Sequence, residues 1–134
     1  MMEDMQVTPS KPPFLLSLLC VFSFVFFGLI SLLFLTSLFY SGSIIRIINE
    51  YIPERPVAPA RVILIVIAGF ILHGAAFTGT VLMLKMKKTG YVVFGIAVLI
   101  ICIYQLFQDK ISLFITLFYI ILIILFGLFY KKFR

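Results

Sequence analysis

The chain has 134 residues, of which 63% are hydrophobic and 12% are charged. A soluble globular domain is typically about 45–50% apolar and about 25% charged, so the composition excludes an ordinary water-soluble fold. The 11 basic and 5 acidic residues, with a net charge of +6, fall in short patches separated by uncharged apolar stretches. This pattern predicts a membrane protein whose crossings use most of the chain.

Four apolar stretches are long enough to cross a bilayer as helices: residues 14–40, 62–84, 91–107 and 111–130. A crossing needs about 17–25 apolar residues to span a hydrocarbon core of about 30 Å. The first stretch exceeds this length and is expected to tilt, whereas the third is near the lower limit. We therefore expect an all-α membrane protein, a bundle of four transmembrane helices forming the single domain 14–130.

The first stretch has a second reading, a cleaved signal peptide, because small residues follow it at positions 41–43. Its apolar run is much longer than the roughly 7–15 residues of a signal core. The preceding segment also carries Glu3 and Asp4, opposed only by Lys11. We therefore interpret the stretch as the first crossing.

The basic residues predict the orientation of the bundle. With four crossings, both termini and the 85–90 loop share one side, which holds seven basic residues: Lys11, Lys85, Lys87, Lys88, Lys131, Lys132 and Arg134. The opposite side holds four: Arg46, Arg55, Arg61 and Lys110. Because an excess of Lys and Arg marks the cytoplasmic face, we expect a plasma (inner) membrane protein with both termini in the cytoplasm.

The cytoplasmic basic residues are also candidates for contact with anionic lipid, at about 1 kcal/mol per side chain near the surface. The candidates are Lys85, Lys87, Lys88, Lys131, Lys132 and Arg134. The lipid bilayer accounts for the positive charge, so we expect no nucleic-acid partner.

The segments between the crossings differ in character. Residues 1–13 include three prolines and little apolar content, which predicts a disordered cytoplasmic tail, and residues 131–134 form a basic cytoplasmic C-terminus. The 85–90 and 108–110 segments are short enough for hairpins, and Gly90 is expected to supply the flexible backbone of the first turn.

The outer loop, residues 41–61, begins with a segment of helical periodicity. Apolar side chains recur through residues 43–52, with Arg46, Asn49 and Glu50 between them. This spacing predicts a short amphipathic helix, lying on the outer leaflet or continuing the first crossing. Three prolines at 53, 56 and 59 then predict an extended connector.

His73 is the only histidine and lies at the centre of the second stretch. An ionisable group at that depth is costly, which makes it a candidate for function. With Thr78 and Thr80 it would line a polar path. The structural alternative is a neutral imidazole hydrogen-bonded to Thr116, Tyr104 or a backbone carbonyl of a neighbouring helix.

Small residues concentrate in the same stretch and make it the expected packing centre of the bundle. In lipid, such residues allow helix backbones to approach closely. The candidates for helix packing are Gly69, Gly74, Ala75, Ala76 and Gly79.

Other chemistry has little support in the sequence. No carboxylate, lysine or arginine lies within a crossing, and Cys20 and Cys102 have no metal-ligand spacing, so we expect no cofactor, no metal site and no enzymatic activity. Glu50, Tyr51, Glu54 and Arg55 are the only clustered surface groups on which a lipid-modifying enzyme site could be built.

The leading functional hypothesis is an accessory or assembly subunit that acts through helix–helix contacts with a membrane-protein partner or with its own copies. The alternative is an oligomeric small transporter or channel with its polar path near His73.

Overall fold

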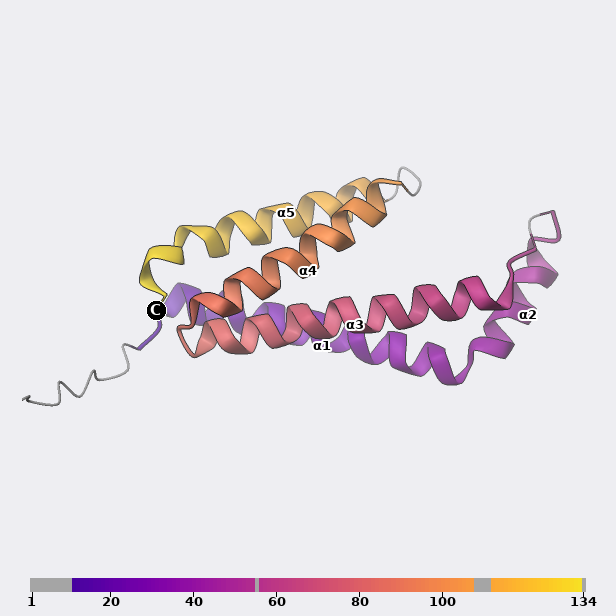
Figure 1. The fold of residues 1–134 in the computed structure, drawn as a ribbon, viewed down its shortest axis with the longest axis horizontal. Coiled ribbons are helices and arrows are strands. Elements are labelled where there is room, and N and C mark those ends of the chain that lie inside the picture. Colours follow the sequence, from indigo (N-terminus) through magenta and orange to yellow (C-terminus); the bar gives the residue numbers. More distant parts are fainter. Residues whose placement is uncertain (1–10, 55, 108–111, 134) are drawn as a thin grey trace, which may run out of the picture.

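The structure is a computed structural model that describes residues 11–54, 56–107 and 112–133. These ranges are all-helical and contain no strand (Figure 1). The elements in chain order are α1 (Phe14–Phe39), α2 (Ser41–Tyr51), α3 (Pro59–Leu84), α4 (Lys88–Leu106), α5 (Ser112–Leu128) and the short 3-10 helix η1 (Tyr130–Lys132). The expected all-α class is therefore confirmed for the described part of the chain.

Within the described ranges, three helices are long and apolar enough to cross a membrane, namely α1 and α3 with 26 residues each and α4 with 19. Their side chains are apolar around most of the circumference, as expected for helices that contact lipid as well as protein. α5 is also apolar but has 17 residues. The first residue of the fourth predicted crossing, position 111, lies outside the described ranges.

The helices form two antiparallel hairpins that lie side by side (Figure 1). α1 and α3 form one layer, and α4 and α5 lie over one half of it, so the other half of α1 and α3 projects beyond them. The beginning of α1 and the C-terminal end of the chain lie at the same end of the molecule. At that end the four helices meet closely, whereas α4 and α5 diverge from α3 toward the opposite end.

The turn between α3 and α4 corrects the role expected for Gly90. The left-handed residue of this turn is Met86, with φ of 58°, and Gly90 lies within α4. A Cβ atom on Gly90 would lie 2.7 Å from the Gly79 carbonyl oxygen and 2.6 Å from the Met83 amide nitrogen. Gly90 is thus required for the close approach of two helix backbones rather than for the flexibility of a turn.

The predicted amphipathic segment forms a separate helix, α2, that turns away from α1 at Tyr40 (Figure 1). α2 contacts α3, and the amide of Val57 donates a 2.9 Å hydrogen bond to Oδ1 of Asn49. The polar residues Arg46 and Glu50 are exposed. The chain therefore bends after the first crossing instead of continuing it straight.

Aromatic side chains form the core where the two hairpins meet. The rings of Phe27 on α1 and Phe94 on α4 pack edge to face, with centroids 5.5 Å apart, and Phe94 packs in the same way on Phe126 of α5 at 5.1 Å. Tyr119 on α5 stacks on Phe27 at 5.7 Å. Because these pairs link three helices, they fix how far apart the two hairpins lie on this side.

Candidate functional site

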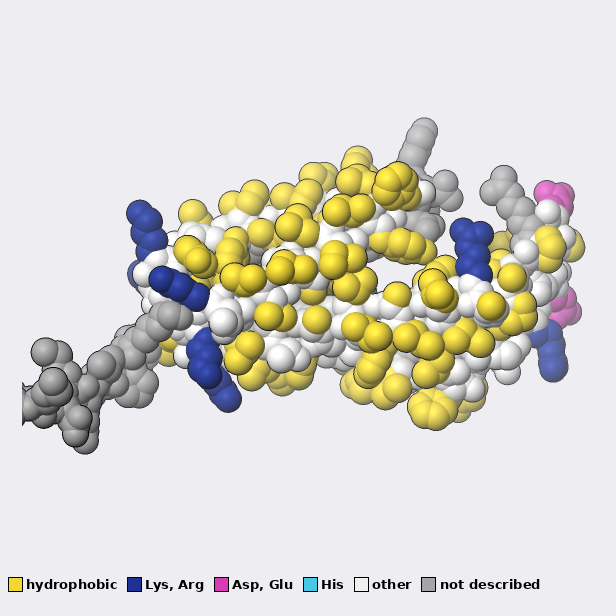
Figure 2. Space-filling model, viewed as in Figure 1, with side chains coloured by type: hydrophobic (Ala, Val, Ile, Leu, Met, Phe, Trp, Pro, Cys, Tyr) yellow, Lys and Arg dark blue, Asp and Glu magenta, His cyan; other side chains and the backbone are white. Residues whose placement is uncertain are grey.

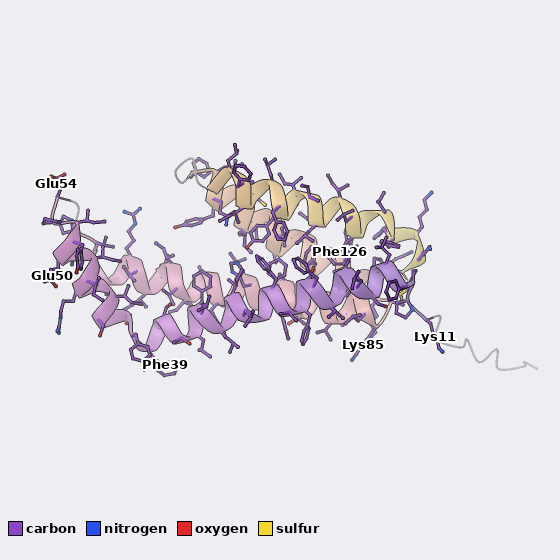
Figure 3. The ribbon with its side chains drawn as sticks, turned by 180° about the vertical axis from the view of Figure 1, so that it is seen from behind. Lys11, Phe39, Glu50, Glu54, Lys85 and Phe126 are labelled. Atoms are coloured by element: carbon purple, nitrogen blue, oxygen red, sulfur yellow. The ribbon has the colours of Figure 1, made fainter. Side chains whose placement is uncertain are left out.

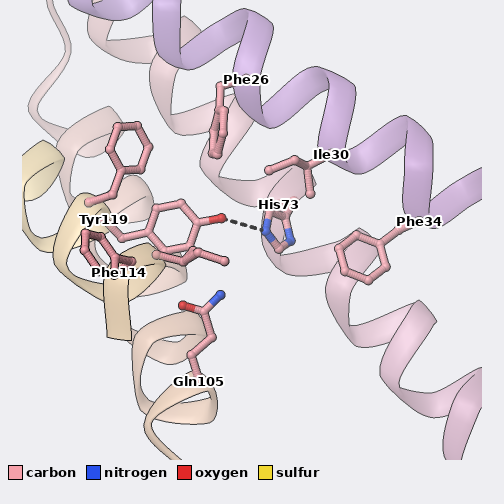
Figure 4. Close-up of a pocket in the computed structure, with 9 residues that line it drawn as sticks. Phe26, Ile30, Phe34, His73, Gln105, Phe114 and Tyr119 are labelled. Atoms are coloured by element: carbon pink, nitrogen blue, oxygen red, sulfur yellow. Dashed lines mark hydrogen bonds between the residues drawn. The ribbon is translucent and has the colours of Figure 1, made fainter. Parts of the chain in front are cut away.

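His73 lies near the middle of α3 and is 6% exposed. Its Nδ1 lies 2.8 Å from the Gly69 carbonyl oxygen, which can only accept, so Nδ1 carries a hydrogen and donates it. In the neutral ring Nε2 is then an acceptor, and the Tyr119 hydroxyl, at 3.3 Å, donates to it (Figure 4). The imidazole therefore joins α3 to α5 through its second nitrogen.

Two rings from α1 hold the imidazole in place. The centroid of Phe34 lies 5.1 Å and that of Phe27 lies 6.0 Å from the centroid of the His73 ring. Phe34 reaches this position because Gly69 has no side chain, and a Cβ atom there would lie 2.5–2.8 Å from atoms of the Phe34 ring. Gly69, one helical turn before His73, thus leaves the space that the Phe34 ring occupies.

The diverging hairpins leave a two-lobed crevice around His73. The first lobe has a volume of about 540 Å³ and is walled mainly by rings of α1 and α5: Phe26, Phe34, Phe114, Phe118 and Tyr119. The second lobe, of about 330 Å³ between α3 and α4, has mainly aliphatic walls: Leu64, Ile65, Ala68, Leu72, Ile100 and Ile101. Phe34, His73 and Gln105 line both lobes. Figure 2 shows the molecule hollowed between the end of α4 and α3, with hydrophobic side chains around the opening.

Polar groups from three helices meet at this crevice. The Thr116 hydroxyl on α5 donates a 3.2 Å hydrogen bond to Oε1 of Gln105 on α4, and Tyr104 lines the aliphatic lobe. Figure 4 shows the amide end of Gln105 in the same pocket as His73 and Tyr119. An apolar pocket with a few convergent polar groups is the usual form of a small-molecule site.

The sequence by itself points to only part of this arrangement. It identifies His73, but the carbonyl partner belongs to Gly69 of the same helix and not to a neighbouring helix, and the side-chain partner is Tyr119 and not Thr116 or Tyr104. Tyr119 is 2% exposed in the middle of α5. Because α5 is apolar on all sides, no pattern in the sequence marks the face of α5 that carries Tyr119 as the inward one.

The two threonines grouped with His73 lie on different faces of α3. Thr80 is fully buried and donates a 3.0 Å bond to the Ala76 carbonyl, whereas Thr78 is exposed and donates a 2.9 Å bond to the Gly74 carbonyl. Both hydroxyls thus bond within their own helix. The structure does not place Thr78 beside His73.

The small residues of α3 divide into an inward and an outward set. Gly69 receives the Phe34 ring, Gly79 contacts the backbone of α4 and Ala76 is fully buried, with Ala75 packed at the edge of the core. Gly74 faces outward, since the nearest atom to a Cβ built there is Ser31 Oγ at 3.8 Å. Beside Ser31 lies an outer groove of about 440 Å³ between α1 and α3, lined also by Gly28 and Phe77.

Basic side chains from distant parts of the sequence converge at one end of the molecule (Figures 2 and 3). The exposed lysines at this end are Lys11, Lys85, Lys87, Lys88, Lys131 and Lys132. Here η1 folds back, so that Phe133 is 3% exposed and Lys88 Nζ lies 5.7 Å from the Tyr130 ring centroid. Glu50 and Glu54 lie at the opposite end (Figure 3). Arg134 lies outside the described residues.

The remaining candidates form no further site in the described ranges. No group of three or more His, Cys, Asp or Glu side chains suited to a metal ion occurs in them, and Cys20 and Cys102 are buried free thiols. Glu50, Tyr51 and Glu54 are exposed, while Arg55 lies outside the described residues.

Comparison of the chain with protein-family models, curated proteins and solved structures found no match. The class of protein is therefore defined by the structure itself: the part of the chain that it describes is all-helical, with three helices able to cross a membrane and a crevice around His73.

Proposed function

We propose that the chain is a plasma (inner) membrane protein with four crossings and both termini in the cytoplasm. Two observations support an even number of crossings: α1 begins at the end of the molecule where the chain finishes, and the lysines converge there (Figures 1 and 2). α5, with 17 residues, is within the range of about 17–25 for a crossing. In this orientation α2 lies at the outer surface of the bilayer.

Within that membrane the protein acts as an accessory or assembly subunit through helix–helix contacts. The observation that carries this proposal is the outward-facing Gly74, which lies next to Ser31 of the groove, together with the exposed Thr78 one turn further along α3. Lipid tails are as apolar as leucine, so helices associate in membranes mainly where small residues permit close packing. The inward small residues already pack within the chain, whereas the outward pair is open to a helix of another chain.

Site-directed cross-linking in native membranes tests this role. Cysteine is introduced in place of Ser31 in the groove, or in place of Ile96, which is 56% exposed on α4, in a protein whose Cys20 and Cys102 are replaced by alanine. We expect Ser31→Cys to give a cross-linked species, and Ile96→Cys to give none. The mass of the product distinguishes a different subunit from a second copy.

The substitution Gly74→Leu tests whether the cross-link depends on close packing of another helix at position 74. A Cβ atom at position 74 has room within the chain, since the one neighbouring atom within 4 Å of it is Ser31 Oγ at 3.8 Å. We expect the variant to fold and to abolish the Ser31→Cys product. If neither the Ser31→Cys protein nor the Ile96→Cys protein gives a cross-linked product, the proposal is contradicted.

The second candidate is an oligomeric transporter or channel with a path along the His73 crevice. Its support is narrower, because His73 lines the crevice but Thr78 and Thr80 do not. Flux in reconstituted vesicles tests it, and a His73→Ala variant with wild-type flux removes the histidine from such a mechanism.

A further inference from the structure

We infer that the two-lobed crevice binds a lipid-soluble quinone, with the planar ring in the aromatic lobe and the isoprenoid tail in the aliphatic lobe. The inference goes beyond the proposed accessory role and does not depend on it. It concerns the inner face of α3, whereas the proposed partner contact concerns the outer face.

The dimensions of the crevice fit a small membrane-soluble ligand. Its lobes, of about 540 and 330 Å³, each lie within the range of roughly 300–1,000 Å³ that is typical of small-molecule sites. They meet at His73 and Gln105, so one molecule can occupy both. The crevice is open at its side, which gives a guest dissolved in the bilayer a way in (Figure 2).

The walls of the lobes differ in a way that matches the two parts of a prenylquinone. Phe26, Phe34 and Phe118 supply ring faces and edges in the first lobe, and aromatic surfaces stack favourably on a flat conjugated ring. Leu64, Ala68 and Ile100 line the second lobe with branched or small aliphatic groups, which suit a flexible hydrocarbon tail.

Side chains with hydrogen-bond donors line the crevice, and a quinone ring bound there requires such donors for its carbonyl oxygens. Quinone carbonyl oxygens only accept hydrogen bonds. Gln105 brings side-chain N–H donors to the wall shared by both lobes, and the Tyr104 hydroxyl lies on the wall of the aliphatic lobe. Figure 4 shows the Gln105 amide and the Tyr119 hydroxyl facing the same space beside His73. A carbonyl placed there accepts a hydrogen bond inside an otherwise apolar pocket, which fixes the ring's orientation.

The depth of these groups distinguishes a quinone from a phospholipid. His73 is near the middle of α3, so the polar cluster lies near the centre of the bilayer if α3 crosses it. A phospholipid in the crevice would place the ends of its acyl chains against the amide and hydroxyls, leaving them without new partners. A quinone carries its acceptors on a headgroup that itself dissolves in hydrocarbon.

The test is binding of two naphthoquinones to the full chain in nanodiscs, with empty nanodiscs as the reference. The first probe is menaquinone with four isoprenoid units, and the second is 2-methyl-1,4-naphthoquinone, which has no tail. Retained quinone is extracted and measured by its absorbance. We expect saturable binding of both probes, with tighter binding of the tailed one.

Two variants assign the lobes. Ala68→Trp fills the aliphatic lobe and is expected to weaken binding of the tailed quinone by about tenfold while leaving the tail-less one unchanged. Ala60→Trp is the matched control, because Ala60 is exposed on the same helix and does not line the crevice. Gln105→Leu is expected to weaken both probes by about tenfold, through loss of the amide donor.

The inference is overturned if no saturable binding exceeds that of empty nanodiscs, or if Ala68→Trp and Ala60→Trp bind the tailed quinone equally. Displacement of the quinone by an equal concentration of phosphatidylglycerol also overturns it, since the crevice would then be a general acyl-chain site. If the Ser31→Cys protein gives no cross-linked product but the chain still binds quinone, only the proposed accessory role is contradicted.

Discussion

The Tyr119 hydroxyl on α5 donates a 3.3 Å hydrogen bond to Nε2 of His73 on α3, and this contact joins the last helix to the small-residue helix. Both side chains are buried, at 2% and 6% exposure. The bond lies at the point where the two hairpins begin to diverge. It therefore marks the boundary between the packed aromatic core and the open crevice.

Tyr119→Phe is expected to lower the free energy of unfolding by about 0.6–1.7 kcal/mol, since interhelical hydrogen bonds in membranes are worth about that much. Unfolding in mixed detergent and SDS micelles measures it. Tyr40→Phe is the control, because Tyr40 is 63% exposed. A double-mutant cycle with His73→Leu isolates the pair, and a coupling energy of zero contradicts the assigned bond.

Gly90→Ala is expected to destabilise the bundle by about 1–3 kcal/mol, because its new Cβ would meet the backbone of α3 at 2.6–2.7 Å and the helices would have to separate. Gly95→Ala, in the same helix, has no atom within 4 Å of the new Cβ. The control is expected to be neutral or to stabilise by up to about 1 kcal/mol, as alanine is the better helix former. Equal effects of the two substitutions in SDS titrations argue against the close contact of α3 and α4.

Gly69→Ala is expected to displace the Phe34 ring, which lies 2.5–2.8 Å from the position of the new Cβ. The clash involves a side chain rather than a backbone, so Phe34→Leu should restore part of the stability lost. The two substitutions together are then less destabilising than the sum of their separate effects. Additive losses of unfolding free energy would contradict the seating of Phe34 on Gly69.

The proposed topology makes a prediction about compartments. Single cysteines in place of Lys87 and Lys132 should react with a membrane-impermeant maleimide only from the cytoplasmic side, and one in place of Glu50 only from the opposite side. All three positions are exposed, and Figure 3 shows Glu50 at the end of the molecule opposite Lys85. Labelling of positions 87 and 132 from opposite compartments would overturn the four-crossing topology.

The clustered lysines are expected to retain anionic lipid. Replacing Lys85, Lys87 and Lys88 with glutamine should weaken phosphatidylglycerol retention in native mass spectrometry by about 1 kcal/mol per side chain. Arg46→Gln with Arg61→Gln is the control, since these exposed cations lie outside the cluster. Raised salt should reduce the difference, because exposed charges are screened. Equal lipid loss in both variants contradicts a localised site.

The errors in the sequence analysis have a common origin. Gly90 was assigned to a turn because glycine and nearby lysines look alike in a loop and at a helix start, but the deciding fact is its contact with Gly79. Thr116 and Tyr104 are the side-chain partners that the sequence suggests for His73, whereas the partner is Tyr119. Each error concerns which neighbour a residue faces, a relation that depends on another helix.

Composition and hydropathy alone predicted the all-helical class, helices apolar enough to cross a membrane, the approximate positions of these helices, and the place of His73 within one of them. These properties are local, because lipid requires each crossing to satisfy its own backbone hydrogen bonds within one helix. The tertiary structure alone decided the rotation of each helix, the bond between His73 and Tyr119, and the crevice where the hairpins diverge. A helix that is apolar on all sides carries no amphipathic pattern to say which side turns inward, so only the shapes of packed rings and glycines select it.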